Sequence, residues 1–484
     1  MNVTKAGPTL VFLLASLLAL ARGQCSGSTA AIPPSATERF LTEVKNPTDW
    51  FKWGGDFRVR NEYFDSAFSL TSGDHLHEQD VLRLRGRLWT SLTPLTNVTL
   101  NARLTGESRE WFEPAFVGAY KAQSGLEWRF GIVDALNLNF GNIFEQPLSL
   151  TLGRQDVLPG ELGDGWLVGD GTPLDGSMTF HFDAARLKYS ADSIETKFNL
   201  MYIYQNPHPG EFMPTLGDST SYPLFEQREQ GLVLYASNKT LQHVPLDGYF
   251  IYKHDARETF DIVGTRKTLG DNADIYTTGG SVTWTPTEHW LSTLEGAYQF
   301  GRKADKILGT FAPRDVDAYG GKAKLTYLFR DELNNQVSLQ GELLSGDNPK
   351  TSEQDEMFDI LWGRWPRWSD LAIYSYGAEV NGRLGQLSNV GRIGANWTFN
   401  PHPKLTLGTT YNAWFAPEET ATRGSAALFS NDGSFRGHFA QALLKWQLNK
   451  HLNGHVLGEW VWQGDYYQQR DVMSFLRAEI LYTF

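Results

Sequence analysis

Val472-Met-Ser-Phe-Leu-Arg-Ala-Glu-Ile-Leu-Tyr-Thr-Phe484, the end of the chain, decides the fold class. Counting back from Phe484, every second residue is apolar: Tyr482, Ile480, Ala478 and Leu476. A β-strand directs alternate side chains to opposite faces, so this segment has one continuous apolar face and one mixed polar face. A soluble strand rarely needs aromatic residues at its very terminus, whereas a strand that faces lipid and closes a ring does. The stretch therefore predicts a membrane β-barrel that is closed by its last strand.

The ending is similar to the last strand of bacterial outer-membrane β-barrels, and earlier segments repeat its pattern. Near the start, Leu82, Leu84 and Leu88 alternate with Arg83, Arg85 and Arg87. Short turns rich in Pro and Asn lie at 93–97, 285–289 and 400–404. Long polar connections lie between them, at 65–79, 110–124, 156–178, 206–228, 255–273, 302–317, 346–388 and 416–434. Alternation of short and long connections is typical of an outer-membrane barrel, with short turns in the periplasm and long loops outside.

The number of strands follows from parity. A simple scan adds one strand too many, because 371–383 has a strand-like composition. Both ends of the chain should lie in the periplasm, so the strand number must be even, and 371–388 must be loop or pore insert. We predict an all-β fold, a transmembrane antiparallel β-barrel of about eighteen strands over residues 51–484. A barrel of this size encloses an aqueous lumen or a plug.

The first fifty residues predict export and a periplasmic lead-in. Lys5 precedes an apolar run from Leu10 to Leu20, which is typical of a secretory signal over residues 1–23, cleaved after Ala21 or Gly23. Residues 24–50 read as a flexible periplasmic lead-in. The single cysteine permits no internal disulfide.

Composition and motifs exclude several classes of function. The net charge of −12 disfavours nucleic acid as a partner. We find no Gly-x-Ser-x-Gly elbow, no His-Glu-x-x-His and no phosphate-binding Gly-rich loop, so we predict no enzyme, no catalytic residues and no cofactor. The carboxylates of 155–185 lack the spacing of a calcium loop, so we predict no metal and interpret the Gly/Asp pattern as tight turns.

The strand alternation assigns basic side chains to the lumen. They are Arg58, Arg60, Arg83, Arg85, Arg87, Arg103, Arg186, Lys188, Lys322, Lys324, Arg392, Lys445 and Arg477. A ring of guanidinium groups selects anions because each offers fixed charge and a planar donor fork for carboxylates. We predict a net positive constriction. The alternative is a wall in which these cations are neutralised by Asp56, Glu62, Glu107, Glu342 and Glu479.

Gly153-Arg154-Gln155, a Gly/Asp loop, the run 182–187 and the run 383–399 resemble the alginate-export family of outer-membrane channels. The resemblance implies a monomeric eighteen-stranded barrel with an arginine-rich, anion-selective constriction for an acidic polysaccharide. Arg154 and Arg186 match the family's motifs. Arg154 shares a row with apolar Leu150 and Leu152, so we expect it either above the membrane or turned inward at a bulge.

The leading hypothesis is a channel in the outer membrane of a Gram-negative-type bacterium that passes an anionic, alginate-like polysaccharide. Its expected partners are outer-membrane lipid, the polysaccharide and periplasmic export machinery. The alternatives are a general or small-anion porin, a barrel enzyme acting on lipids or peptides, and a loop-based adhesin. Within the connection 346–388, we predict that Glu353, Asp355, Glu356 and Asp359 form a solvated face.

Overall fold

The structure is a computed structural model of the whole chain. It describes residues 36–74, 76–113, 125–169, 180–207, 213–217, 226–262, 265–304, 312–348, 350–380, 387–418, 428–430 and 433–484. The predicted signal segment 1–23 lies outside these residues and stays a prediction.

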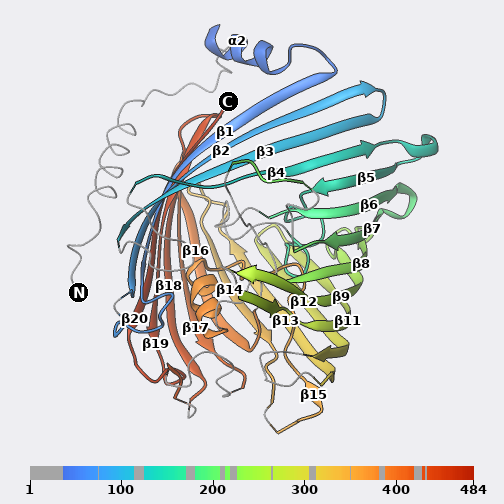
Figure 1. The fold of residues 1–484 in the computed structure, drawn as a ribbon. Helices are drawn as coiled ribbons and strands as arrows, with labels where there is room; N and C mark the ends of the chain where they lie inside the picture. Colours follow the sequence, from blue (N-terminus) through green and yellow to red (C-terminus); the bar gives the residue numbers. More distant parts are fainter. Residues whose placement is uncertain are drawn as a thin grey trace.

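The chain forms a closed antiparallel β-barrel of 18 strands (Figure 1). The strands of its first half are β1 Phe51–Asp65, β2 Glu78–Leu95, β3 Val98–Glu113, β4 Glu127–Phe140, β5 Leu148–Gln155, β6 Phe182–Ala191, β7 Thr196–Gln205, β8 Gln227–Asn238 and β9 Leu246–Ile262. Those of its second half are β11 Asn272–Thr287, β12 Trp290–Ala304, β13 Arg314–Leu328, β14 Gln336–Leu344, β16 Val390–His402, β17 Leu405–Phe415, β18 Phe435–Gln447, β19 Leu452–Gln463 and β20 Val472–Thr483.

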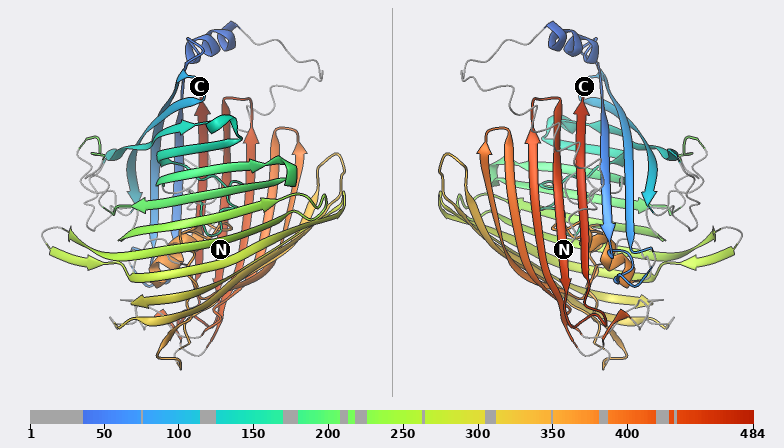
Figure 2. Two further views of the ribbon diagram at one scale, coloured as in Figure 1. Left: turned by 90° about the vertical axis from the view of Figure 1, so that its right-hand side faces the viewer. Right: turned by 90° about the vertical axis from the view of Figure 1, so that its left-hand side faces the viewer.

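The last strand closes the ring, as the alternation of its residues predicts. β20 pairs with β1, with Val59 opposite Ile480 and Arg60 opposite Glu479 (Figure 2). Beyond the strand, the backbone N–H of Phe484 donates to the carbonyl of Gly55 at 3.0 Å. Glycine is required at position 55, because a Cβ there would lie 2.3 Å from the ring of Phe484.

The prediction of an even number near eighteen strands is confirmed. Two further elements, β10 Thr265–Leu269 and β15 Gln354–Asp355, belong to connections and not to the ring. The segment that resembles an extra strand contains helix α4, Leu371–Glu379. The prediction that it is loop or pore insert is therefore confirmed over its described residues.

Both ends of the barrel wall lie at the end that carries the short turns, which is the periplasmic end (Figure 1). The short turns include η2 Ile143–Glu145 and η3 Asp192–Ile194. Part of the predicted flexible lead-in is helical, since residues Ala36–Lys45 form α2. Trp53 on β1 donates its indole N–H to the carbonyl of Val44 at 2.7 Å and ties the helix to the barrel.

One long connection was predicted wrongly. Residues 255–273 are not a loop, because β9 continues to Ile262 and pairs with β10. The antiparallel pairing of this hairpin extends past the ring, as its β-branched residues favour. Two other predicted connections are also partly strand: the described residues of 110–124 belong to β3, and most of those of 302–317 belong to β12 and β13. The described residues of the remaining long connections are mostly outside the strands.

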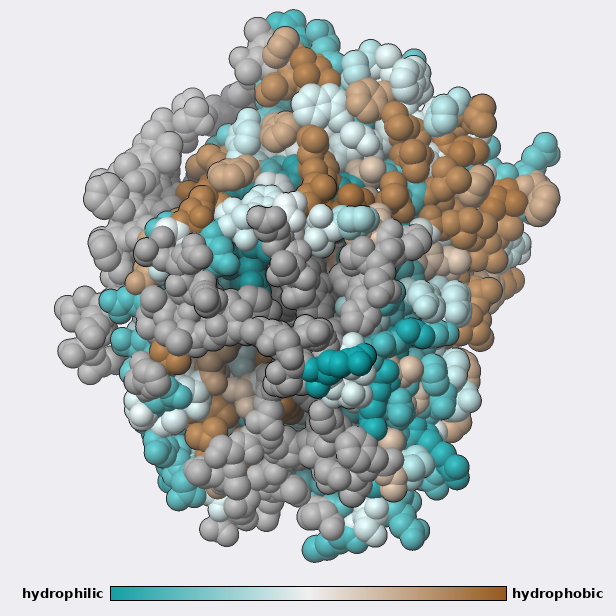
Figure 3. All heavy atoms as spheres, in the orientation of Figure 1, coloured by the Kyte–Doolittle hydropathy of each residue, from teal (hydrophilic) through white to brown (hydrophobic). Residues whose placement is uncertain are grey.

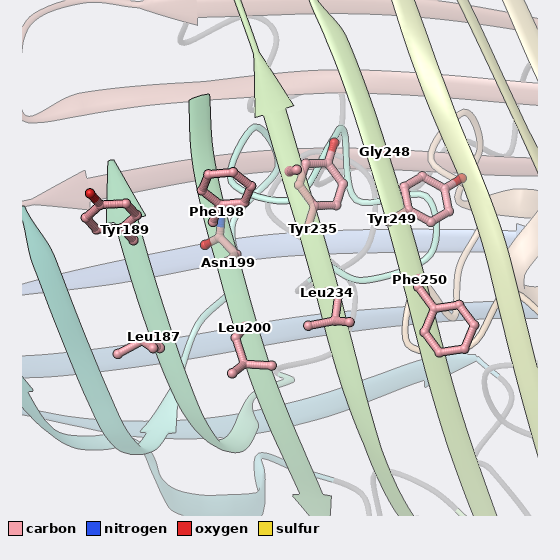
Figure 4. Close-up of a pocket in the computed structure, with 11 residues that line it drawn as sticks. Leu187, Tyr189, Phe198, Asn199, Leu200, Leu234, Tyr235, Gly248, Tyr249 and Phe250 are labelled. Carbon is pink, nitrogen blue, oxygen red and sulfur yellow. The ribbon is translucent and has the colours of Figure 1, made fainter. Parts of the chain in front are cut away.

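The outer wall is apolar. Leu187, Leu200, Leu234 and Phe250 face each other in register across β6, β7, β8 and β9. They line a shallow groove of about 450 Å³ (Figure 4). On the described part of the face in Figure 3, hydrophobic residues gather over the strands nearer the periplasmic end, and hydrophilic residues gather toward the other end. None of the described helices is long and apolar enough to cross a membrane.

Candidate functional site

Five predicted lumen arginines lie in a buried ion-pair network on neighbouring strands of the barrel wall. They are Arg58, Arg60, Arg83, Arg85 and Arg477, which are all nearly inaccessible to solvent. Glu107 accepts from Arg83 at 2.9 Å and from Arg58 at 3.3 Å. Glu62 accepts from Arg83 at 3.0 Å and from Arg477 at 2.9 Å. These guanidinium groups face inward as the alternation predicts, but carboxylates of the wall already occupy them.

Arg87 and Arg103 are partly accessible. The Arg87 Nε donates to Asp56 at 2.7 Å, and Arg85 lies 3.5 Å from the same carboxylate. Arg103 donates to Asp134 at 2.9 Å and to Asp156 at 2.6 Å. The Arg87 side chain is 22% exposed. Since both side chains are partly exposed, at 22% for Arg87 and 18% for Arg103, they can contact a solute that the buried arginines cannot reach.

Arg154 turns inward, which is one of the two expected outcomes. Gly153 has a φ of +112°, a conformation that L side chains rarely adopt, and it breaks the alternation of β5 at this point. Arg154 is buried, donates to Asp183 at 2.8 Å and donates to the carbonyl of Val133 at 2.8 Å. Burial, together with the positive charges of Arg154, Arg103 and Arg364, holds the pKa of His181 well below its usual range.

Arg186 and Lys188 share one carboxylate, which comes from the connection between β5 and β6. We call its described residues, 156–169, the β5–β6 segment. Glu161 of this segment accepts from Arg186 Nη1 at 3.1 Å and from Lys188 Nζ at 2.7 Å. Burial raises the pKa of Glu161, but the Lys188 hydrogen bond and the Arg186 charge outweigh it and lower the pKa below its ordinary value.

The same segment reaches the opposite wall. Asp164 pairs with Lys322 on β13, and Trp166 donates its indole N–H to Glu342 on β14 at 3.1 Å. Glu342 also accepts from Arg392 on β16 at 2.9 Å. The acidic residues of this segment therefore act as partners for lumen cations. Gly163 and Gly165, both with positive φ, form the tight turn expected around Asp164.

Lys188, Lys324 and Lys445 form what we call the inner collar. They lie near the periplasmic ends of β6, β13 and β18. Lys324 and Lys445 are exposed, and the side chain of Lys188 is partly exposed. Among the described residues, Lys324 and Lys445 have no carboxylate within ion-pair distance. The inner collar is therefore the most accessible group of lumen cations among the predicted residues.

A second inward segment crosses the lumen. We call its described residues, 345–348 and 350–380, the β14–β16 segment. Arg364 pairs with Glu229 on β8. Trp362 packs over Gly231 on β8, where a Cβ would lie 2.3 Å from its ring, and Phe358 packs over Gly320 on β13. Because these glycines have no side chain, the aromatic rings can pack directly against the backbone of the wall strands.

Helix α4 holds the end of the β14–β16 segment against the other side of the barrel (Figure 1). Just before α4, Asp370 accepts from Arg477 of β20 at 2.8 Å. Glu459 of β19 accepts from the Ser369 hydroxyl at 3.0 Å and from the Leu371 backbone N–H at 2.6 Å. The segment is thus fastened to several strands around the ring.

The sequence prediction missed part of this site. Glu459 lies on the inward row of β19, so alternation alone could have found it. Arg364 carries no such signal, because it is in an irregular segment whose path depends on the whole wall. The prediction that Glu353, Asp355, Glu356 and Asp359 form one solvated face is wrong: Asp355 is fully buried and lies 3.2 Å from Arg314. It serves as a counterion at the outer end of β13.

The sequence matches the model of the alginate export family over residues 49–478. The chain belongs to the alginate export family. Members of this family and porin-like barrels are transport channels, so the protein is an outer-membrane channel of Gram-negative bacteria and not an enzyme.

Solved structures with a similar fold are porins. The chain is similar to OccK2 (OpdF) of Pseudomonas aeruginosa, with 14% identity, a TM-score of 0.54, and coverage of 89% of this chain and 97% of that one. It is also similar to a BenF-like porin from Pseudomonas fluorescens Pf-5, with 10% identity, a TM-score of 0.53, and coverage of 89% and 98%. A second OccK2 structure is a complex with glucuronate, with 14% identity, a TM-score of 0.52, and coverage of 89% and 98%. Comparison with curated proteins gives no match.

Proposed function

We propose that the channel passes a carboxylated saccharide, an alginate-like polysaccharide, through a lumen whose accessible cations bind it weakly. The observation that carries this proposal is the inner collar, since Lys324 and Lys445 are exposed and Lys188 is partly exposed near the periplasmic mouth. An ammonium group attracts a uronate carboxylate, and several such groups around one mouth attract a polymer that carries a carboxylate on each residue.

The deeper arginines are paired with wall carboxylates, which supports a channel in which the polymer slides through and is not held tightly. Conduction requires sites that are favourable enough to enter and weak enough to leave. A bare, buried guanidinium would hold a carboxylate tightly, because the pair would be shielded from water. With wall carboxylates as partners, Arg83 and Arg477 offer no such trap, while partly exposed Arg87 and Arg103 provide intermediate contacts. We therefore propose Arg87, Arg103 and the inner collar as the groups that contact the passing chain.

The two inward segments favour a second candidate, a porin for small carboxylates. They contact each other, because Trp166 stacks on Phe358 with ring centroids 5.5 Å apart. Segments that meet inside the lumen narrow it, which suits a single extended chain or a free uronate. The glucuronate complex of OccK2, at 14% identity, is consistent with a uronate of that size.

We also propose that the barrel acts as a monomer and receives the polymer from periplasmic export machinery. The closure of the ring within one chain, β20 against β1, supports a monomer. Delivery from the periplasm fits the position of the inner collar at that mouth. Chemical cross-linking in membranes would test both: we expect no barrel–barrel product, and products with periplasmic proteins in cells that make the polymer.

The central experiment is the reversal potential of single channels in planar bilayers under a salt gradient, before and after oligouronates of increasing length are added. We expect anion preference and transient block whose dwell time grows with length. Substitution of Lys188, Lys324 and Lys445 by Gln should weaken the block and reduce anion preference. Exposed Lys450, in the β18–β19 turn, provides the matched control, K450Q. Cation preference would contradict the proposal, and block by monouronate without any length dependence would favour the small-anion porin.

A further inference from the structure

Glu161 occupies a position that suits a carboxylate ligand. Its two oxygens accept from two different cations, at 2.7 Å from Lys188 and at 3.1 Å from Arg186. Arg186 and Lys188 project from the wall strand β6. Glu161 comes from the β5–β6 segment, which contacts that strand but is not part of the sheet. Its side chain is 32% exposed, so water reaches the ion pair from one side.

Arg186 has a donor that the protein leaves unused. Its side chain is only 2% exposed, Nη1 donates to Glu161, and Nη2 donates to Asn199 at 3.1 Å. The Nε of Arg186 is buried and has no hydrogen-bond partner among the described residues. A buried donor without a partner is unfavourable, so this site favours an additional or alternative acceptor. A carboxylate that meets the guanidinium through two parallel bonds satisfies such a donor, whereas Glu161 makes one bond to it.

A cavity lies beside these cations. It has a volume of about 460 Å³ and is lined by Arg186, Lys188, Lys197, Ser149 and Asn199, among others. Cavities of roughly 300–1,000 Å³ hold small ligands in proteins, so the space suffices for one sugar acid. The hydroxyl of Ser149 and the amide of Asn199 are the groups that sugar hydroxyls can use, and Lys197 adds a third cation.

We propose that Arg186 and Lys188 form a uronate-binding subsite in which Glu161 is a built-in competitor that an incoming substrate carboxylate displaces. This inference rests on the proposed function and deepens it. Exchange of one carboxylate for another leaves the buried Arg186 paired throughout, which avoids the large penalty of an unpaired buried charge. The substrate is therefore bound only transiently, because Glu161 is always available to replace it.

Displacement also links the substrate to the position of the β5–β6 segment. The Leu158 backbone N–H donates to Glu161 at 3.0 Å, and further along the segment Trp166 lies against Phe358 of the second segment. When Glu161 leaves the cations, the segment loses its only described ion pairs to β6. Binding of a uronate is thus coupled to loosening of the inward segments.

The test compares two variants of one segment that remove the same charge. E161Q removes the competitor, and D164N removes one partner of Lys322, which keeps its ion pair with Glu295, without touching the subsite. Current block by D-glucuronate is titrated in planar bilayers for both variants and for the wild type. We expect the blocking concentration to fall about tenfold in E161Q, because a charge-assisted competitor is lost, and to change less than twofold in D164N.

A second variant keeps the inference testable if E161Q folds poorly. K188Q retains Glu161 but removes one of the two cations, and it should raise the blocking concentration at least severalfold. Equal effects of E161Q and D164N, in channels that remain anion-selective, would overturn the competitor role and leave the proposed function standing. Loss of both anion preference and block in the wild type would instead overturn the proposed function.

Discussion

Substitution of Gly320 tests whether the β14–β16 segment narrows the channel. A Cβ at Gly320 would lie 2.9 Å from the nearest atom of the Phe358 ring, which is buried. Real Cβ contacts are longer, so even Ala forces the ring to shift, and the two methyl groups of Val reach further into it. We expect the G320V barrel to remain closed, because the neighbouring strand pairing does not involve the ring.

The magnitude follows from overpacking. Forcing extra methyl groups into a packed contact costs about 1–3 kcal/mol. If the conformation with Phe358 packed on the wall is destabilised by about 2 kcal/mol, the population of the displaced conformation rises roughly thirtyfold relative to it. Because Trp166 stacks on Phe358, the β5–β6 segment should loosen as well. We therefore expect a larger single-channel conductance and more frequent current fluctuations in G320V.

The matched control is G296V, on the adjacent strand β12. Gly296 faces outward, and the nearest atom to a Cβ there is the carbonyl oxygen of Gly320 at 3.9 Å. Both variants add the same volume to neighbouring strands, but only one meets the inward segment. Equal conductance of G320V, G296V and the wild type would refute the idea that Phe358 holds the segment in the ion path.

Three other outcomes follow from the wall and the mouth. D370A leaves Arg477 buried with fewer carboxylates and should destabilise the barrel by about 3 kcal/mol, seen as a lower denaturant midpoint; an unchanged midpoint would contradict the network. Deletion of Phe484 removes its contact with Gly55 and should destabilise the closed barrel by about 1–2 kcal/mol. The temperature of barrel opening on semi-native gels should therefore fall by several degrees. An unchanged temperature would mean that the Phe484 side chain contributes nothing to barrel closure. Oligouronate added on the periplasmic side should block with a higher on-rate than the same oligouronate added outside, and equal on-rates would argue against the role of the inner collar.

The alternation of residues was sufficient to predict the barrel and the side of the wall on which most charges lie. Most strands follow a period of two, and the apolar row of β20 can be recognised without tertiary information. Arg154 departs from the rule because Gly153 adopts a positive φ, which the sequence allows but does not require. The β9–β10 hairpin was missed because it extends beyond the barrel wall. Its strands there depend on pairing with each other and do not need the lipid-facing apolar row by which the other strands were recognised.

The partners of the lumen arginines could not be predicted in the same way. Arg60 donates to Glu479 at 2.6 Å across the seam between the first and last strands, and no local pattern links two residues that far apart in sequence. Glu161 and Asp370 come from irregular segments, whose inward path depends on wall glycines such as Gly231, over which an aromatic ring of the segment packs. A list of inward cations therefore does not give the charge that a solute meets.

The distinction between paired and accessible charges separates two roles. In the wall, each of the predicted lumen arginines lies beside a carboxylate, so its field largely cancels within a Debye length of about 8 Å at physiological salt. An ion in the lumen is therefore governed mainly by the groups at the two mouths. The outer ends of the first four strands carry Asp65, Glu78, Glu113 and Glu127, whereas the periplasmic mouth carries the lysines of the inner collar. Under the proposed function, we expect a polyanion to be attracted at the inner mouth and repelled at the outer ends of these strands, which would favour capture from the periplasm and release outside. Such asymmetry changes the rate at which each mouth captures a polyanion, whereas the concentration gradient sets the net direction of transport. Mutations at the mouths should therefore alter transport, and mutations in the paired wall should alter stability.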